Sequence, residues 1–193
     1  MKLKKPLVLA SKSPRRRKLL SSLGFEFDVV ESNYKEVKSS GYFDFRDYVI
    51  NSAFNKADEV AKRMKKDCIV IGADTIVVLD NEILHKPVDR QDAFQILKKL
   101  SNRSHTVFTG VVLIDNETEK SLGNVQATEV RFRELQDEEI WAYIESGSPM
   151  DKAGAYGIQD DFGAVFVSHI NGCYYNIVGL PLEMFYTMLK KFV

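Results

Sequence analysis

The chain has 193 residues, of which 45% are hydrophobic and 11% aromatic, so it can bury a sizeable core as one domain or as two closely joined lobes. Its 27 Lys and Arg residues balance 27 Asp and Glu residues, which disfavours a broad basic face for nucleic acid or an anionic membrane surface. The widely separated Cys68 and Cys173 favour a reduced, cytoplasmic chain, with a disulfide as the alternative. No apolar run reaches the length of a signal-peptide core or a membrane span.

The first predicted helix has the features of an anion-binding site. A short apolar strand over residues 7–10 leads into Ser13, which suits a helix N-cap, and Pro14, which suits the first helical position. Backbone N–H groups at such a helix start bind phosphate well. The side chains that could join them there are Ser11, Ser13, Arg15 and Arg16. The alternative is a solvated basic first turn, although cations at a helix N-terminus are mildly unfavourable.

Strand and helix patterns alternate along the rest of the chain, which favours an α/β architecture. The predicted strands are residues 7–10, 25–30, 68–79, 106–114, 126–132 and 164–170. The predicted helices begin at Pro14, near Val49, after Asp89, at Asp137 and at Pro181, and residues 32–43 are irregular. Residues 68–79 are almost uninterruptedly apolar and β-branched, as in a central strand that is covered on both faces.

Asp74 lies inside that central strand, where an unpaired buried carboxylate would cost several kcal/mol. It therefore needs a partner. One interpretation is a carboxylate that caps backbone N–H groups at a strand break beside Gly72. The functional alternatives are metal ligation or general-base catalysis at the mouth of the sheet. The neighbouring Thr75 could offer a hydroxyl to a substrate, but strand alternation points it to the opposite face unless Gly72 bends the chain.

Four further charged residues are candidates for the same site. Lys86 precedes a proline that would hold it on a rigid loop, and Lys56 lies beside the apolar stripe of the long second helix. Lysine side chains are ordinarily solvated. These two are candidate site residues only because Asp74 and the arginines are candidates for the same site. Glu31 and Glu36 flank the irregular loop, and either could bring a second carboxylate for Mg²⁺.

The segment MDKAGAYGIQDDFGAVFV, residues 150–167, contains three glycines around Tyr156 and Gln159. Its glycines indicate tight turns or a close approach of the backbone to a ligand. It matches neither a P-loop nor a Rossmann fingerprint. The three histidines show no metal-ligand spacing and are interpreted as loop or packing residues, and the sequence shows no Ser-His-Asp or Cys-His arrangement.

Together these motifs give a chain that resembles the Maf family of nucleoside triphosphate pyrophosphatases. The matching segments, in order, are LASKSPRR, GADTIVV, KP, HTVFTG, PMDKAGAYGIQ and INGCYYNIVGLPL, and they extend over nearly the full length. The resemblance implies one domain over residues 1–193 with a mixed sheet, flanking helices and two lobes around a central cleft, similar to inosine triphosphate pyrophosphatases. It also implies a homodimer that cleaves nucleoside triphosphates to monophosphate and pyrophosphate with Mg²⁺, or with Mn²⁺ or Co²⁺.

Site roles follow from the resemblance residue by residue. It implies that Asp74 is the general base, that Glu36 is the catalytic acidic residue, and that both bind the metal. The matched phosphate-loop residues and active-site lysines are Ser11, Arg15, Arg16, Lys56 and Lys86. The family usually has an acidic pair at Glu36, whereas Lys35 precedes it here.

Substrate preference is also implied. Arg15, Thr75 and Gln159 match the positions that separate a dTTP/UTP subgroup from a 7-methyl-GTP subgroup, and the Thr and Gln are of the dTTP/UTP type. CTP and modified pyrimidine nucleotides are further candidate substrates, while residues 160–161, both Asp, depart from the small residues of relatives. The alternative is a non-catalytic nucleotide-binding regulator of cell division, which the broken acidic pair favours and the retention of Asp74 and Lys86 disfavours.

Overall fold

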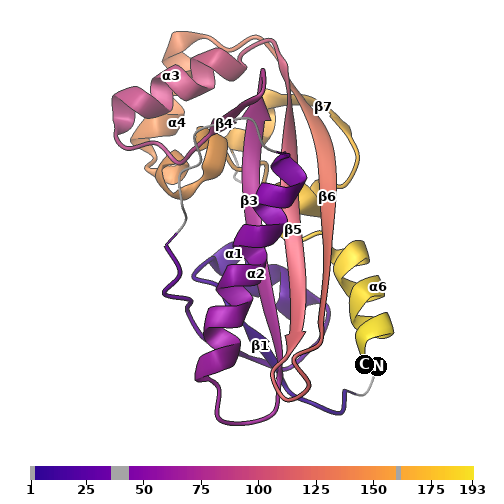
Figure 1. Ribbon diagram of the computed structural model, residues 1–193. Coiled ribbons are helices and arrows are strands. Elements are labelled where there is room, and N and C mark those ends of the chain that lie inside the picture. Colours follow the sequence, from indigo (N-terminus) through magenta and orange to yellow (C-terminus); the bar gives the residue numbers. More distant parts are fainter. Residues whose placement is uncertain (1–2, 36–43, 160–161) are drawn as a thin grey trace. The chain divides into compact units, whose positions relative to one another are not determined.

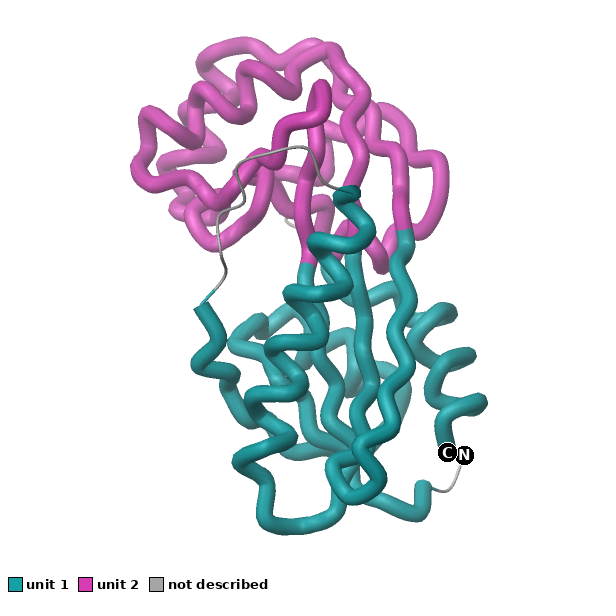
Figure 2. Tube along the Cα trace, viewed as in Figure 1, with its two compact units in different colours: residues 1–74, 109–126, 179–193 teal, residues 75–108, 127–178 magenta. Residues whose placement is uncertain are grey.

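The computed structural model describes residues 3–35, 44–159 and 162–193, and the chain divides into two compact units (Figure 2). Unit 1 comprises residues 1–74, 109–126 and 179–193, and unit 2 comprises residues 75–108 and 127–178. Three long strands contain residues of both units: β3 (Ile69–Leu79), β5 (Ser104–Asp115) and β6 (Ser121–Phe132) (Figure 1). One unit boundary falls inside β3, between the predicted site residues Asp74 and Thr75.

Unit 1 contains a parallel group of three strands, with helices on both faces of the central strand. Its own elements are β1 (Leu7–Leu9), α1 (Pro14–Ser22), β2 (Phe27–Val29), α2 (Phe45–Arg63) and α6 (Leu182–Phe192). The central strand β1 pairs in parallel with β2 and with β3, so that Leu7 lies opposite both Phe27 and Ile69. Alternate side chains of a strand point to opposite faces, and each face of β1 accordingly joins a different core cluster.

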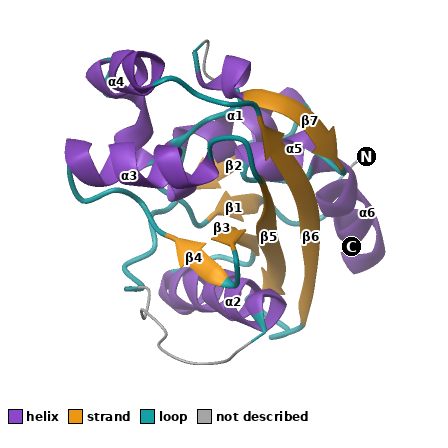
Figure 3. Cartoon of the chain, turned by 90° about the horizontal axis from the view of Figure 1, so that it is seen from above, coloured by secondary structure: helices purple, strands orange, loops and turns teal. Residues whose placement is uncertain are grey.

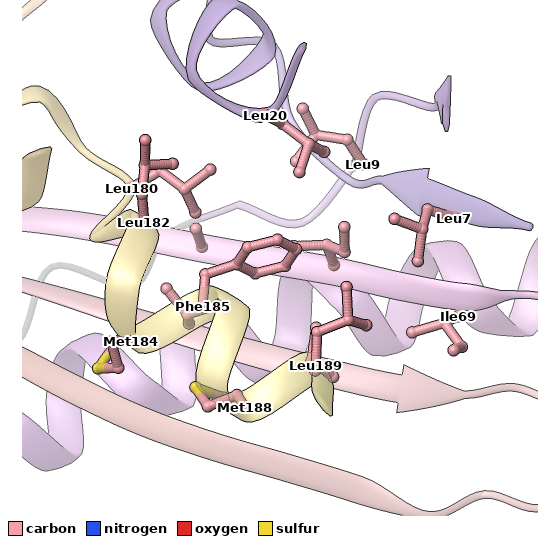
Figure 4. Packing of buried hydrophobic residues seen from close by; sticks show 14 residues of the cluster. Leu7, Leu9, Leu20, Ile69, Leu180, Leu182, Met184, Phe185, Met188 and Leu189 are labelled. Atoms are coloured by element: carbon pink, nitrogen blue, oxygen red, sulfur yellow. The ribbon is translucent and has the colours of Figure 1, made fainter. Parts of the chain in front are cut away.

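The first cluster joins β1 to α1 and α6. Leu7 and Leu9 pack with Leu20 of α1 and with Phe185 and Leu189 of α6 (Figure 4). The second cluster, on the opposite face, joins Val8 to the small residues of α2, and Figure 3 shows α2 on one side of β1 and β3 with α1 on the other.

Two glycines let the backbone of α2 lie against the sheet. A Cβ atom at Gly72 of β3 would lie 2.2 Å from the carbonyl oxygen of Ala53, and one at Gly110 of β5 would lie 2.7 Å from that of Val49. Strand β3 runs unbroken over Ile69–Leu79. The alternative interpretation of Asp74 as a cap at a strand break beside Gly72 is therefore wrong, because this glycine makes room for a helix instead of bending the chain.

Unit 2 holds the remaining elements. These are β4 (Glu82–Leu84), α3 (Arg90–Leu100), α4 (Asp137–Glu145), the 3₁₀ helices η1 (Ser148–Asp151), η2 (Ala153–Ala155) and η3 (Gly163–Phe166), β7 (Val167–Asn171) and α5 (Tyr174–Val178). Strand β4 folds back antiparallel on β3 through a turn in which Asp80 and Asn81 have φ of 51° and 63°. The sheet of the described residues is mixed, in the order β2-β1-β3-β5-β6-β7, with β4 paired to β3.

Most predicted elements are confirmed, and the differences have local causes. Strand β4 was not predicted because its residues Glu-Ile-Leu show no polar–apolar alternation, and η1 to η3 were not predicted because short glycine-rich turns carry no apolar period. Strand β6 begins at Ser121 and not at residue 126. Strand β7 begins at Val167 and not at residue 164, because the preceding residues form η3. Within the described ranges, no helix is long and apolar enough to cross a membrane.

Candidate functional site

The start of α1 has the predicted cap. Ser13 adopts an extended conformation, its Oγ accepts a hydrogen bond from the N–H of Arg16 at 3.4 Å, and Pro14 opens the helix. The N–H of Ser13 in turn donates to Oγ of Ser11 at 3.1 Å. A serine cap of this kind contributes roughly 1 kcal/mol to a helix. The two serines therefore set the path of the backbone into α1.

Arg16 is held at this turn by protein groups on two sides. Its Nε donates to the carbonyl oxygen of Gly179 at 2.8 Å, and its Nη1 lies 3.4 Å from Oγ of Ser11. Gly179 has a φ of 113°, a conformation that side-chain-bearing residues rarely adopt. Arg15, one residue earlier, is half-buried on the same turn. The structure thus brings together three of the predicted phosphate-loop residues, Ser11, Arg15 and Arg16.

Asp74 has a buried partner, as its position in the strand required. The Nζ atom of Lys56, on α2, lies 2.6 Å from Oδ1 of Asp74, and the two side chains are only 14% and 8% exposed. The close approach of α2 at Gly72 brings the lysine within reach. Removing one member of a buried ion pair leaves an uncompensated charge, at a cost of about 3–5 kcal/mol.

The helix start and the ion pair lie at the same edge of unit 1. Leu9 pairs with Ile71 in the parallel ladder, and the next N–H, that of Ala10, donates to the carbonyl of Ile71 at 2.8 Å. Ser11 and Asp74 come just after these paired positions on adjacent parallel strands. Open α/β sheets bind ligands at the carboxyl ends of their strands. Ser11 and the start of α1 follow the carboxyl end of β1, and the Lys56–Asp74 pair lies at the same level on the adjacent strand, within β3.

The predicted site residues of unit 2 lie on three segments. Thr75 is half-buried on β3, Lys86 is exposed just before the buried Pro87, and Gln159 is half-buried in the turn after η2. The loop that carries Lys86 is tied to the glycine-rich segment, because the N–H of Gly154 donates to the carbonyl of His85 at 3.3 Å. Unit 2 therefore links the lysine loop directly to the segment that leads to Gln159.

Of the two candidate second carboxylates, Glu36 lies outside the described residues. Glu31 is exposed, and its carboxylate lies 3.6 Å from Nζ of Lys12. In residues 3–35, 44–159 and 162–193, no group of three or more His, Cys, Asp or Glu side chains could hold a metal ion. A metal at Asp74 would therefore take most of its ligands from water, from the substrate or from Glu36.

The sequence did not single out the buried polar network of unit 2. His105 contacts the hydroxyl of Tyr156, and the hydroxyl of Tyr143 accepts a hydrogen bond from the N–H of Gly157. His105 was predicted to be a packing residue, and its burial confirms that. The signal that could have marked the network is the position of two tyrosines and a histidine in otherwise apolar patterns, where each polar atom needs a partner.

The comparisons with known proteins agree with this architecture. The family model described as Maf-like protein matches residues 6–192. The dTTP/UTP pyrophosphatase of Thermoanaerobacter sp. (strain X514) is 49% identical over 185 residues, which are 96% of this chain and 95% of the relative. The dTTP/UTP pyrophosphatase of Clostridium botulinum (strain Alaska E43 / Type E3) is also 49% identical, over 96% of this chain and 98% of the relative.

Among solved structures, a HAM1 protein from Coxiella burnetii is similar with a TM-score of 0.55 and 17% identity, over 97% of this chain and 99% of that one. This likeness concerns the fold alone, and it confirms the predicted mixed α/β class. Because the family model covers nearly the whole chain and the relatives match it at almost half of their positions, the chain belongs to the Maf-like protein family.

Proposed function

We propose that this chain hydrolyses nucleoside triphosphates, with dTTP and UTP as the leading substrates, to the monophosphate and pyrophosphate. The observation that carries the proposal is the buried Lys56–Asp74 pair, which lies at the same sheet edge as the arginine-bearing start of α1. The names of the relatives, dTTP/UTP pyrophosphatase, support the same activity.

The unit 1 residues supply the groups that attack of water on a phosphorus atom needs. Asp74 is the general base, and Lys56 fixes its Oδ1, which leaves the other carboxylate oxygen for the attacking water. Arg15 and Arg16 meet the negative charge of the phosphates, which guanidinium groups can bind in a bidentate manner. Because Gly179 and Ser11 already hold Arg16, its guanidinium needs little reorganisation on binding.

The metal belongs to the same proposal. Mg²⁺ prefers one or two carboxylates together with waters and substrate phosphate oxygens, and the carboxylate of Asp74 fits that donor chemistry. We assign Asp74 and Glu36 as its protein ligands, with Mn²⁺ and Co²⁺ as alternative ions. When bound, the ion would neutralise charge on the triphosphate and stabilise the pyrophosphate leaving group.

The unit 2 residues would recognise the rest of the substrate. The amide of Gln159 offers an acceptor and donors that can pair with the O4 and N3–H edge of uracil or thymine. The hydroxyl of Thr75 can contact the nucleotide, and the exposed ammonium of Lys86 can contact its phosphates. CTP is a further candidate substrate, because cytosine presents a different pattern that a rotated amide can meet.

Other parts of the proposal come from the sequence. The resemblance implies the homodimer and the joint action of both units as one catalytic domain. The two separated cysteines favour the cytoplasmic location, and the balanced charge disfavours a nucleic-acid partner. The alternative function, a nucleotide-binding regulator of cell division without turnover, predicts the same binding groups and no product.

The test is to incubate the purified protein with UTP, dTTP, CTP, GTP and 7-methyl-GTP and to measure monophosphate and pyrophosphate. We expect both products from UTP and dTTP, loss of turnover with a chelator, and recovery with Mg²⁺. Asp74→Asn should lower kcat by roughly 10²-fold or more, whereas Asp58→Asn, in the exposed ion pair of α2 with Lys62, should not. Nucleotide binding without either product would support the regulator instead.

A further inference from the structure

A buried polar pair lies beneath the glycine-rich segment of unit 2. Nε2 of His105, on β5, lies 2.7 Å from the hydroxyl of Tyr156, and the two residues are 3% and 5% exposed. The rings of His105 and Tyr156 meet edge to face, and Phe132 contacts both in the same way. The contact holds residue 156 by a polar group as well as by packing.

The next residue is held by a second hydroxyl from a different element. The N–H of Gly157 donates to the hydroxyl of Tyr143, on α4, at 3.1 Å, and Tyr143 is 1% exposed. The Tyr143 ring also packs against Phe162 and, edge to face, against Phe166. Because a buried backbone N–H must find an acceptor, this hydroxyl does what a phenylalanine ring at the same place could not.

Neighbouring atoms also pack closely against the backbone at two glycines, and these contacts restrict the segment further. Gly154 has a φ of 69°, and a Cβ atom there would lie 2.9 Å from Cγ2 of Val77 on β3. At Gly163 a Cβ atom would lie 2.4 Å from the carbonyl oxygen of Gly157 and 3.0 Å from the hydroxyl of Tyr143. The backbone around residues 154–157 is thus confined by β3, by α4 and by the start of η3, and Gln159 follows two residues later.

We propose that Tyr143 and the His105–Tyr156 pair are positioning residues for base selection, which act by fixing the backbone that carries Gln159. This inference rests on the proposed function, in which the amide of Gln159 reads the base edge. An amide discriminates between bases only if its acceptor and donors are held in one orientation, since a mobile amide can rotate to suit another base. The tyrosine hydroxyls supply that restraint without touching the substrate.

The test compares Tyr143→Phe and Tyr156→Phe with Tyr186→Phe, a matched control on α6 whose side chain is 39% exposed. We measure kcat/KM for UTP, CTP and GTP. Loss of one hydrogen bond weakens the ordering of the segment by a modest amount, so we expect the preference for UTP over CTP to fall about threefold to tenfold in the first two variants. The change should lie in KM for UTP, and the control should match the wild type.

A double-mutant cycle shows whether the hydroxyl acts through Gln159. In a Gln159→Ala background, Tyr143→Phe should leave the remaining UTP-to-CTP ratio unchanged, because coupled residues give non-additive effects. An equal loss of kcat/KM for all nucleotides would overturn the inference and assign the hydroxyls to stability alone. So would an unchanged ratio in both tyrosine variants, or a failure of both to fold.

The inference and the proposed function fail in different ways. A wild-type protein that yields no monophosphate or pyrophosphate from any nucleotide overturns the proposed function, and the positioning role with it. A wild-type protein that hydrolyses UTP selectively, together with tyrosine variants of the same selectivity, overturns only the positioning role.

Discussion

Unit 1 holds its predicted base, Asp74, in a buried ion pair, whereas unit 2 holds the segment before Gln159 with neutral hydroxyl groups. In unit 1 the carboxylate of Asp74 is fixed by the ammonium of Lys56, and Arg16 by a carbonyl and a serine. In unit 2 the segment before Gln159 is fixed by the hydroxyls of two buried tyrosines. Charged groups suit phosphate chemistry and a neutral amide suits base recognition, so the difference fits the roles proposed for Asp74 and Gln159.

The largest expected effect separates stability from chemistry in unit 1. Asp74→Asn should cost about 3–5 kcal/mol of unfolding free energy, because the buried Lys56 ammonium loses its partner. Asp74→Asn combined with Lys56→Met should regain most of that stability, and its turnover should stay at least ~10²-fold below wild type. Denaturant unfolding and pyrophosphate release measure the two quantities.

The exposed pair on the same helix is the control for that experiment. Lys62→Met removes the partner of Asp58, whose side chain is 30% exposed, and should change stability by no more than about 1 kcal/mol. Restored turnover in the double variant would show that Asp74 is a structural carboxylate, and the contrast between the two units would then lose its catalytic meaning.

The buried His105 of unit 2 predicts a pH dependence of the stability. Burial lowers the pKa of His105 from 6.5 to about 4, so the unfolded chain takes up this proton before the folded chain does. Stability from this residue is therefore full above pH 6.5 and falls as the pH drops from about 6.5 to 4, by about 3 kcal/mol in total.

His105→Gln removes the titrating group and keeps a polar partner for Tyr156. Chemical denaturation of both proteins between pH 7 and pH 4 should show a steeper loss for the wild type. Parallel curves would mean that His105 takes up a proton as readily in the folded chain as in the unfolded chain, so that burial does not lower its pKa.

Gln159→Glu places a charge at the position proposed to read the base. A carboxylate facing the O4 acceptor of uracil leaves polar groups unpaired, so kcat/KM for UTP and dTTP should fall by a factor that corresponds to about 1–3 kcal/mol. Gln95→Glu, at an exposed position of α3 in the same unit, is the control. A wild-type preference for 7-methyl-GTP, or an unchanged profile in the variant, would refute base reading by Gln159.

The smallest expected effect concerns geometry within unit 1. Arg16→Lys keeps the charge but loses the planar fork and the Nε–H that binds Gly179, so KM for triphosphates should rise by about tenfold. Arg17→Lys, at the next and exposed position, should leave KM unchanged. Equal KM values for Arg16→Lys and wild type would mean that charge alone is needed at this turn.

The sequence predicted the fold where local chemistry decides it. Ser13 and Asp89 were expected to cap helices, and each accepts the N–H three residues later. The Ile69–Leu79 strand could be predicted because both of its faces are buried, which gives a nearly continuous apolar run in the sequence. Strand β4 and the 3₁₀ helices show no polar–apolar period in the sequence, and for that reason they were not predicted.

The site was predictable in its residue types but not in its pairings. Burial demanded a partner for Asp74, yet no local rule points to Lys56, 18 residues earlier on another element. In the sequence, Tyr143 occupies one more apolar position of α4. Only the fold shows that its hydroxyl accepts a hydrogen bond from the N–H of Gly157. Glu36 was predicted as a catalytic carboxylate and lies outside the described residues, so its role stays a prediction.

The absence of a side chain at Gly72 has a consequence for any mutational survey of this chain. A methyl group there would meet the Ala53 carbonyl at 2.2 Å and the Ala57 Cβ at 2.8 Å, and both flank Lys56 on α2. Relieving that overlap moves the helix outward and carries the lysine away from Asp74. A screen for lost turnover would therefore score position 72 as severely as position 74, although glycine has no side chain that could take part in catalysis.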